Sequence, residues 1–214
     1  MEDAITIPAS FLVIPIAGYL LGSVPFGLIL AKIFGGRDVR TAGSGNIGAT
    51  NVSRVAGPFA GILTLLLDVA KGAGAVLLAA LFSQGSMLWM MIAGLCALVG
   101  HCFPLWLKFR GGKGVATAAG VFIVMNPMAF LGAIAVFLLV VAVTRYVSLG
   151  SICAAMAMPI LVYFLPAAHV PLYIVFVGAL AAGTLIIYKH SANIQRLVRG
   201  DEPKFSFGKK KAAA

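Results

Sequence analysis

The sequence is divided into long apolar runs separated by short polar or proline-containing breaks, and this pattern leaves little choice of fold. A helix needs about 20 mostly apolar residues to cross a bilayer, and its backbone polar groups must be satisfied without water. With 61% hydrophobic and 10% charged residues in 214, the chain has too little polar surface for a water-soluble domain. We therefore expect an all-α polytopic membrane protein with apolar runs at residues 8–34, 55–82, 87–107, 115–125, 128–144, 149–165 and 171–188.

The seven runs predict seven transmembrane helices, of which the fourth, residues 115–125, is short. A helix of that length rises about 16 Å, so it needs help to cross a hydrocarbon core about 30 Å thick. We expect this helix to begin directly after the glycine-rich loop that precedes it. The predicted organisation is one integral-membrane domain over residues 1–202 and a basic cytoplasmic tail over residues 203–214.

Positive charge is distributed unevenly among the connections between the runs. Fifteen of the sixteen Lys and Arg residues fall in or beside the first, third and fifth connections or in the C-terminal tail, and only Lys71 lies inside a run. Because loops rich in Lys and Arg stay in the cytoplasm, we expect the N-terminus outside and the C-terminus inside. The net charge of +10 favours contact with anionic membrane lipids. We expect Lys209, Lys210 and Lys211 to make that contact.

The first positively charged connection contains the glycine-rich motif GSGNIGATNVSR at residues 43–54. Glycines let several backbone N–H groups turn toward one anion, and an arginine offers a planar fork for phosphate oxygens. A loop without function is the alternative. The motif favours phosphate binding through Ser44, Asn46, Asn51 and Arg54.

The third connection contains Gly111, Gly112, Lys113 and Gly114 at the start of the short fourth helix. A helix N-terminus favours negative charge, because its first backbone N–H groups are unpaired. The segment is not a nucleotide-binding P-loop, since it lacks the first glycine and the Ser or Thr that holds magnesium. We expect it to bind phosphate without hydrolysing a nucleotide.

The fifth connection and the following helix start offer Arg145, Ser148 and Ser151. One interpretation is that all three bind phosphate. The alternative is an arginine that stops membrane transfer, followed by serines that cap the helix.

Beyond the last run, His190 and Asn193 are three residues apart, so on a helix they share one face, and Arg196 lies close behind them. Asp68 and Lys71 are also three apart, but within an apolar run. Ionisable residues inside a membrane are costly and tend to pair. We expect these two to form an ion-paired structural strut, with ion translocation as the alternative.

Together, residues 43–54, 100–117 and 190–196 resemble the motifs of the bacterial membrane glycerol-3-phosphate acyltransferases that use acyl-phosphate as donor. The order and spacing of all three motifs agree, and the resemblance runs from the first span to about Glu202. One departure is at residues 191–192, where the family pattern has a basic and an acidic residue and this chain has Ser and Ala.

The resemblance implies transfer of an acyl chain from acyl-phosphate to the 1-hydroxyl of sn-glycerol 3-phosphate, the first step of phospholipid synthesis. The products would be lysophosphatidic acid and phosphate. It also implies seven spans in the bacterial inner membrane and a site that faces the cytoplasm. In this resemblance Ser44 and Arg54 are needed for activity, the loop at 111–114 holds glycerol 3-phosphate, and His190 and Asn193 serve catalysis.

An acyl-phosphate carbonyl is already activated, so the glycerol hydroxyl can attack it without an enzyme nucleophile, metal or cofactor, and we expect none of these. The proton acceptor is either His190 or an oxygen of the donor phosphate, and Asn193, with Asn46 or Asn51, would donate to the carbonyl oxygen. We take His101, Asp68, Lys71 and Arg196 as supporting residues. The alternative function is a transporter or flippase for a phosphorylated solute. We expect no nucleic-acid partner and favour a monomer.

Overall fold

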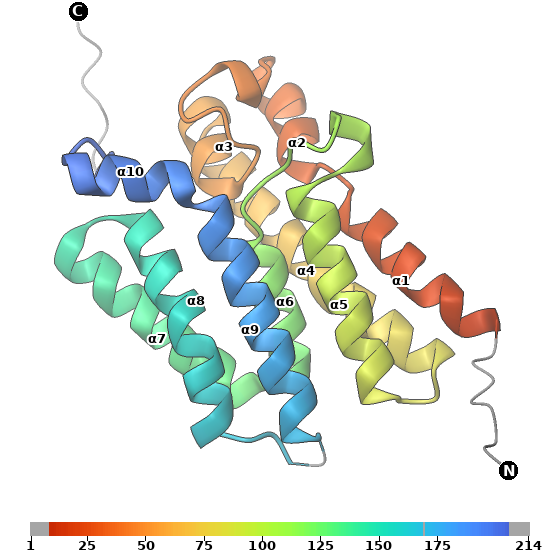
Figure 1. Ribbon diagram of the computed structural model, residues 1–214. Coiled ribbons are helices and arrows are strands. Elements are labelled where there is room, and N and C mark those ends of the chain that lie inside the picture. Colours follow the sequence, from red (N-terminus) through yellow and green to blue (C-terminus); the bar gives the residue numbers. More distant parts are fainter. Residues whose placement is uncertain (1–8, 169, 206–214) are drawn as a thin grey trace, which may run out of the picture.

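The computed structural model describes residues 9–168 and 170–205, and every regular element in that part of the chain is helical (Figure 1). The sequence-based expectations for residues 1–8 and for Lys209, Lys210 and Lys211 lie outside the described residues. The elements are α1 (Ala9–Gly22), α2 (Phe26–Gly35), η1 (Val39–Thr41), α3 (Ala49–Ala56), α4 (Pro58–Phe82), α5 (Met87–Cys102), η2 (Leu105–Leu107), α6 (Val115–Met125), α7 (Pro127–Thr144), α8 (Val147–Phe164), α9 (Leu172–Lys189) and α10 (Ser191–Arg199).

Six helical segments in the described residues are long and apolar enough to cross a membrane. They are Leu12–Gly35, Pro58–Phe82, Met87–Leu107, Pro127–Thr144, Val147–Phe164 and Leu172–Lys189. Large apolar side chains such as Leu139 and Val143 of α7, which are 66% and 77% exposed, cover the outside of this bundle. In water such a surface would be unstable, whereas in lipid it is the expected one. The chain is therefore a multi-pass integral membrane protein.

The short helix α6 lies among the longer ones and contacts α4, α5, α7 and α9. Its Val121, Phe122 and Met125 are buried, so protein rather than lipid surrounds it. At the break between α6 and α7, Asn126 hydrogen-bonds through both ends of its amide. Its Nδ2 donates to the Leu165 carbonyl oxygen over 2.9 Å, and its Oδ1 accepts from the Ala129 backbone N–H in the first turn of α7. The bounds of α6 confirm the prediction of a short helix directly after the glycine-rich loop.

We expected the first apolar run to form one continuous helix, but it forms two. Helix α1 ends at Gly22 and α2 begins at Phe26, and Pro25 at the break has no N–H to continue the helical hydrogen bonds. At this break the carbonyl oxygen of Val24 accepts hydrogen bonds from Lys71 Nζ at 3.0 Å and from the Phe26 backbone N–H at 3.1 Å. The lysine inside the membrane therefore ties α4 to the break between α1 and α2.

The segment between α2 and α4 is more structured than the loop expected from the sequence. Residues Ala49–Ala56 form helix α3, and Gly57, with φ of 92°, separates it from α4. The reason is a small apolar core that α3 shares with α2 and with the loop before it. Its buried members are Leu28, Ala31, Val39, Ile47, Val52 and Ala60.

The connections that carry the three sequence motifs lie at one end of the bundle, the upper end in Figure 1. There the segment between α2 and α4, the loop between α5 and α6, and helix α10 come together. The α4–α5 and α8–α9 connections lie at the opposite end. The fold thus gathers the segments in which we expected phosphate-binding residues.

Candidate functional site

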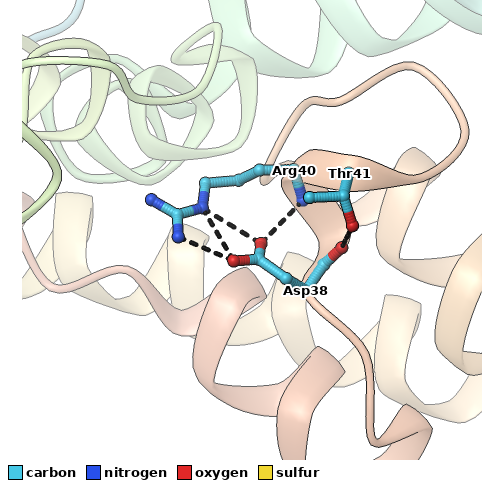
Figure 2. A network of polar contacts seen from close by, with 3 residues as sticks. All are labelled: Asp38, Arg40 and Thr41. Carbon is cyan, nitrogen blue, oxygen red and sulfur yellow. Dashed lines mark hydrogen bonds and ion pairs between the residues drawn. The ribbon is translucent and has the colours of Figure 1, made fainter.

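The connection that leads from α2 toward α3 is ordered by Asp38, which begins η1 (Figure 2). Its carboxylate accepts from the Arg40 backbone N–H at 2.9 Å and from the Arg40 guanidinium at 2.6 Å, while the Thr41 hydroxyl donates to the Asp38 carbonyl oxygen. The hydrogen bond from Arg40 lowers the pKa of the Asp38 carboxyl to about 2, so the pair stays charged at neutral pH. Arg40 thus stabilises the conformation of this connection through its hydrogen bonds to Asp38.

Asn51 on α3 holds the glycine-rich loop together. Its Oδ1 accepts from the Ser44 backbone N–H at 2.8 Å, and its Nδ2 lies within hydrogen-bonding distance of three backbone carbonyl oxygens, those of Val39, Ala42 and Asn46. A side chain at Gly43, whose φ is 61°, would collide with the same Oδ1. The expectation that Asn51 binds substrate is therefore corrected: its amide is used within the loop, which it presents to the site.

The loop between α5 and α6 is fastened to the end of α5 by backbone hydrogen bonds. Gly112 N–H donates to the His101 carbonyl oxygen at 3.0 Å, and Gly111 N–H donates to that of Cys102 at 3.2 Å. The loop passes so close to α5 that a Cβ on Gly112 would overlap Nε2 of His101. His101 therefore lies directly beneath the loop.

Beneath His101 lies the buried pair that the sequence predicted. Lys71 Nζ is 2.8 Å from Asp68 Oδ1, and both side chains are at most 3% exposed. The ring nitrogen Nδ1 of His101 is 3.6 Å from the same carboxylate oxygen. Because burying one charge alone is costly, these groups hold one another in place. The expected ion pair is confirmed, and it connects the break between α1 and α2 with the glycine-rich loop.

Lys113 follows this loop and reaches toward α10, where its Nζ donates to Asn193 Oδ1. Burial is the main reason that the pKa of Lys113 is lowered to about 8; the carboxylate of Glu202 opposes this shift, and the positive charges of Arg196 and Arg54 add to it. The ammonium therefore retains its proton at neutral pH but lies close to its titration range.

His190, between α9 and α10, is buried, and its Nδ1 lies 2.8 Å from the Ile186 carbonyl oxygen. A carbonyl oxygen only accepts, so Nδ1 carries the hydrogen and Nε2 keeps a lone pair. Burial lowers the pKa of His190 to about 4, helped by the charge of Lys113 and opposed by Glu202. The neighbouring Lys189 donates from Nζ to the Cys102 carbonyl oxygen at 3.0 Å, which joins α9 to the end of α5.

Glu202 is the residue that the sequence analysis missed. The chain turns after α10 and brings its carboxylate back against α8 and α10, where it accepts from Ser148 Oγ, Asn193 Nδ2 and Arg196 Nε. These hydrogen bonds and the charge of Arg196 outweigh burial and lower the pKa of the Glu202 carboxyl. Gly200, the C-cap of α10, makes this turn with a positive φ. A glycine shortly after a predicted helix often ends it in this way, so Gly200 was the sequence signal for the turn.

A pocket of about 200 Å³ opens where these segments meet. Residues of all three sequence motifs line this pocket. The lining residues are Ser44, Gly45, Asn46, Gly111, Lys113, Lys189, Ala192, Asn193 and Arg196.

The remaining expected site residues lie around this pocket rather than along its wall. Arg54 is exposed on α3, and its charge acts on Lys113. Arg145 donates from Nε to the Phe205 carbonyl oxygen at 3.3 Å, and Ser151 Oγ donates to the Val147 carbonyl of its own helix. Neither residue lines the pocket, and their binding of phosphate stays a prediction.

Chemically, the pocket wall is suited to a small anion with hydroxyl groups. Lys113, Lys189 and Arg196 are cationic, no Asp or Glu is among the lining residues, and Ser44, Asn46 and Asn193 add a hydroxyl and two amide groups. Charge-assisted hydrogen bonds of this kind are stronger than neutral ones. The site lies at the end of a lipid-facing bundle, where a ligand with an apolar chain can also approach.

Comparison with known proteins agrees with this chemistry. A family model described as glycerol-3-phosphate acyltransferase matches residues 12–200. The glycerol-3-phosphate acyltransferase of Syntrophotalea carbinolica is 49% identical over 201 residues, which is 92% of this chain and 98% of that protein. That of Trichlorobacter lovleyi is 52% identical over 191 residues, covering 89% of this chain and 95% of that protein.

Two solved structures are also similar. A crystal structure of PlsY (YgiH), an integral membrane glycerol 3-phosphate acyltransferase in its glycerol 3-phosphate form, is 40% identical with a TM-score of 0.85, covering 92% of this chain and 96% of that one. The lysophosphatidic acid form is 38% identical, with a TM-score of 0.83 and the same coverage. Matches that extend from α1 to the end of α10 establish that the chain belongs to the glycerol-3-phosphate acyltransferase family.

Proposed function

We propose that the chain transfers a fatty acyl group from acyl-phosphate to the 1-hydroxyl of sn-glycerol 3-phosphate, giving lysophosphatidic acid and inorganic phosphate. The observation that carries this proposal is the convergence of Lys113, Lys189 and Arg196 on one pocket beside two glycine-rich segments. The solved relatives support the acceptor and the product, since one is in a glycerol 3-phosphate form and the other in a lysophosphatidic acid form.

Both substrates carry phosphate, and the site has enough donors for two phosphate groups. In this proposal the loop at 111–114 binds the phosphate of glycerol 3-phosphate through the Lys113 ammonium, while the N–H groups of Gly111 and Gly112 hold the loop on α5. Ser44 and Asn46, which line the pocket, and Arg54 of α3 bind the donor phosphate, in a loop that the Asn51 hydrogen bonds hold in shape. Two anions held side by side would repel each other in water, so these cations are needed to bring the reacting groups together.

The acyl transfer needs no enzyme nucleophile. The 1-hydroxyl oxygen forms an ester bond with the acyl carbonyl carbon, the bond from that carbon to the phosphate oxygen breaks, and phosphate leaves with the electron pair. One N–H of Asn193 is bonded to Glu202, and its amide nitrogen carries a second hydrogen. We assign that hydrogen to the developing oxyanion, which hydrogen-bond donors stabilise in such reactions.

The hydroxyl proton passes, in this proposal, to an oxygen of the departing phosphate. A general base works best with a pKa near the working pH, whereas His190 has a pKa of about 4 because it is buried. Phosphate monoanion has a pKa of roughly 6, which suits it better. His190 then binds the hydroxyl through its neutral ring.

The placement in the membrane follows from charge. All three motif-bearing segments lie at one end of the bundle (Figure 1), and that end carries the Lys and Arg residues of the connections. Because positively charged loops remain in the cytoplasm, we propose seven spans, counting α6, with the site at the cytoplasmic face of a bacterial inner membrane.

The experiment is a phosphate-release assay with purified protein and palmitoyl-phosphate. We expect phosphate to appear only when glycerol 3-phosphate is present, in equal amounts with lysophosphatidic acid, and palmitoyl-coenzyme A to replace palmitoyl-phosphate poorly. Uptake of glycerol 3-phosphate into vesicles without any phosphate release would instead favour the transporter.

A further inference from the structure

We propose that Glu202 is a positioning residue of this site, which orients the Asn193 amide and, through it, the Lys113 ammonium. The inference rests on the function proposed above, because it assigns a role within the same reaction. Glu202 does not line the pocket, so it acts on the reacting groups through its neighbours.

The carboxylate of Glu202 is fully engaged. Its Oε1 accepts from Ser148 Oγ and from Asn193 Nδ2, each at 2.6 Å, and its Oε2 accepts from Arg196 Nε at 2.7 Å. The side chain is only 7% exposed. A buried carboxylate is costly unless it is paired and hydrogen-bonded, and these three donors meet that requirement.

Glu202 and Lys113 together allow one orientation of the Asn193 amide. The carboxylate can only accept, so it faces Nδ2, and the ammonium can only donate, so it faces Oδ1. A flipped amide would turn its oxygen toward the carboxylate and its N–H toward the ammonium, which makes both contacts repulsive. The acidic residue therefore determines which side of Asn193 meets Lys113.

The segment that carries Glu202 is held against the bundle by contacts on both sides. Asp201 N–H donates to the Arg196 carbonyl oxygen at 2.9 Å, and Phe205 N–H donates to that of Arg145 at 2.7 Å. Lys204 Nζ lies 5.6 Å from the centre of the Tyr146 ring. The position of the carboxylate is thus built into the fold, and this gives Arg145 a structural role near the site.

Glu202 also affects the charge of Lys113. The carboxylate raises the pKa of Lys113, which burial, Arg196 and Arg54 lower, with about 8 as the result. Lys189 lines the same pocket, and His190 is close enough for its pKa to respond to Lys113. Since Glu202 is the acidic group among these neighbours, its loss must lower the pKa of Lys113 and weaken the ammonium as a phosphate ligand at neutral pH.

The test compares Glu202→Gln with Glu202→Asp, which keeps the charge, and with Asp201→Asn as a matched control. Asp201→Asn removes the same charge one residue away at an exposed position. With palmitoyl-phosphate as donor, we expect Glu202→Gln to raise KM for glycerol 3-phosphate about tenfold at pH 7.5, the effect of losing one charged hydrogen-bond partner. The rise of KM with alkaline pH should begin at lower pH than in the parent protein. Glu202→Asp should recover part of the loss, and Asp201→Asn should behave as the parent.

A second measurement does not depend on turnover. Acetic anhydride modifies only neutral lysine, so the extent of Lys113 acetylation against pH, measured by mass spectrometry of the peptide, reports its protonation. We expect a midpoint near 8 in the parent and a lower one in Glu202→Gln but not in Asp201→Asn. An unchanged midpoint would overturn the inference, and so would a lower KM in Glu202→Gln, which would mean that the carboxylate competes with substrate. If the parent shows no turnover but the midpoints shift as expected, the proposed function fails while the coupling stands.

Discussion

Lys113 Nζ donates a hydrogen bond to Asn193 Oδ1 across 80 residues of sequence. This contact joins the glycine-rich loop before α6 to the helix that follows the last span. Each residue comes from a segment in which we expected chemistry, and each is held from behind: Lys113 by the loop that is fastened over His101, and Asn193 by Glu202. The contact joins the second and third motifs, and Ser44 and Asn46 of the first motif line the same pocket.

Removal of the Lys113 amine should mainly weaken binding of the acceptor. We expect Lys113→Ala to raise KM for glycerol 3-phosphate by roughly 10- to 100-fold, which corresponds to loss of a charge-assisted hydrogen bond to phosphate. Initial rates over a range of glycerol 3-phosphate at saturating palmitoyl-phosphate measure this. Expression and melting temperature should stay near those of the parent. An unchanged KM in a well-folded variant would remove Lys113 from the phosphate site.

The same residue predicts how the parent protein depends on pH. The pKa of Lys113 is lowered to about 8, so the amine is a cation below that pH and neutral above it. KM for glycerol 3-phosphate should therefore be nearly constant from pH 6.5 to 7.5 and rise about tenfold for each pH unit well above 8. Rates must be corrected for the spontaneous hydrolysis of the donor. A KM that falls as the pH rises through 9 would contradict the assignment.

His190 gives a different pH prediction. Because burial holds its pKa at about 4, the ring is neutral throughout pH 6–9, and His190 should cause no change of rate with pH in that range. In His190→Gln, whose amide can still hydrogen-bond a hydroxyl, kcat should stay within about tenfold of the parent, since a general base contributes typically 10²–10⁴-fold. A larger loss of kcat, together with a new pH dependence, would instead identify His190 as the base.

The close approach between the loop and α5 predicts a sharp effect of one methyl group. A Cβ at position 112 would overlap His101 Nε2, whereas a Cβ at Gly74 of α4 would meet only Leu21 Cδ2 at 3.7 Å. Gly112→Ala should therefore displace the loop and reduce kcat/KM by at least tenfold. Gly74→Ala should leave activity unchanged and stabilise α4 slightly, since alanine favours helices. Similar activities for the two variants would show that the loop can move away from His101 without loss.

The buried pair beneath the site should show strong coupling in stability. Replacing only Asp68 by Asn leaves the Lys71 charge without its counterion, and removing one partner of a buried pair typically costs about 3–5 kcal/mol. The double variant Asp68→Asn, Lys71→Met should cost less than the two single variants combined, although it still removes the Lys71 hydrogen bond to the Val24 carbonyl oxygen. Thermal unfolding in detergent measures this. Strictly additive effects would contradict the role of the pair.

Much of this arrangement could be predicted from local patterns in the sequence. The apolar runs locate the helices within a few residues, and the spacing of Asp68 and Lys71 predicts their ion pair. The glycines and bases at residues 43–54 and 111–114 indicate which segments bind anions, and the alternation of charge indicates that they share one side of the membrane.

Other features depend on contacts between distant segments and left no such pattern. The apolar run 8–34 includes residues 23–25, where the structure has a break between α1 and α2. Pro25 was the one sequence signal for that break. Asn51 looks like a ligand in the sequence because a polar residue in a glycine-rich loop could bind either substrate or backbone, and only the fold shows that it binds backbone. Glu202 is one of two adjacent acids in a basic tail, and only the turn at Gly200 brings its carboxylate to Asn193.

The most direct test of the site is protection of Lys113 by the acceptor. Purified protein is treated with acetic anhydride at pH 8 in increasing glycerol 3-phosphate, and acetylation of Lys113 is compared with that of the exposed Lys108. The account predicts that glycerol 3-phosphate slows modification of Lys113 but not of Lys108, with half-protection at a concentration close to KM. A rate of Lys113 acetylation that saturating glycerol 3-phosphate leaves unchanged would show that the acceptor binds elsewhere.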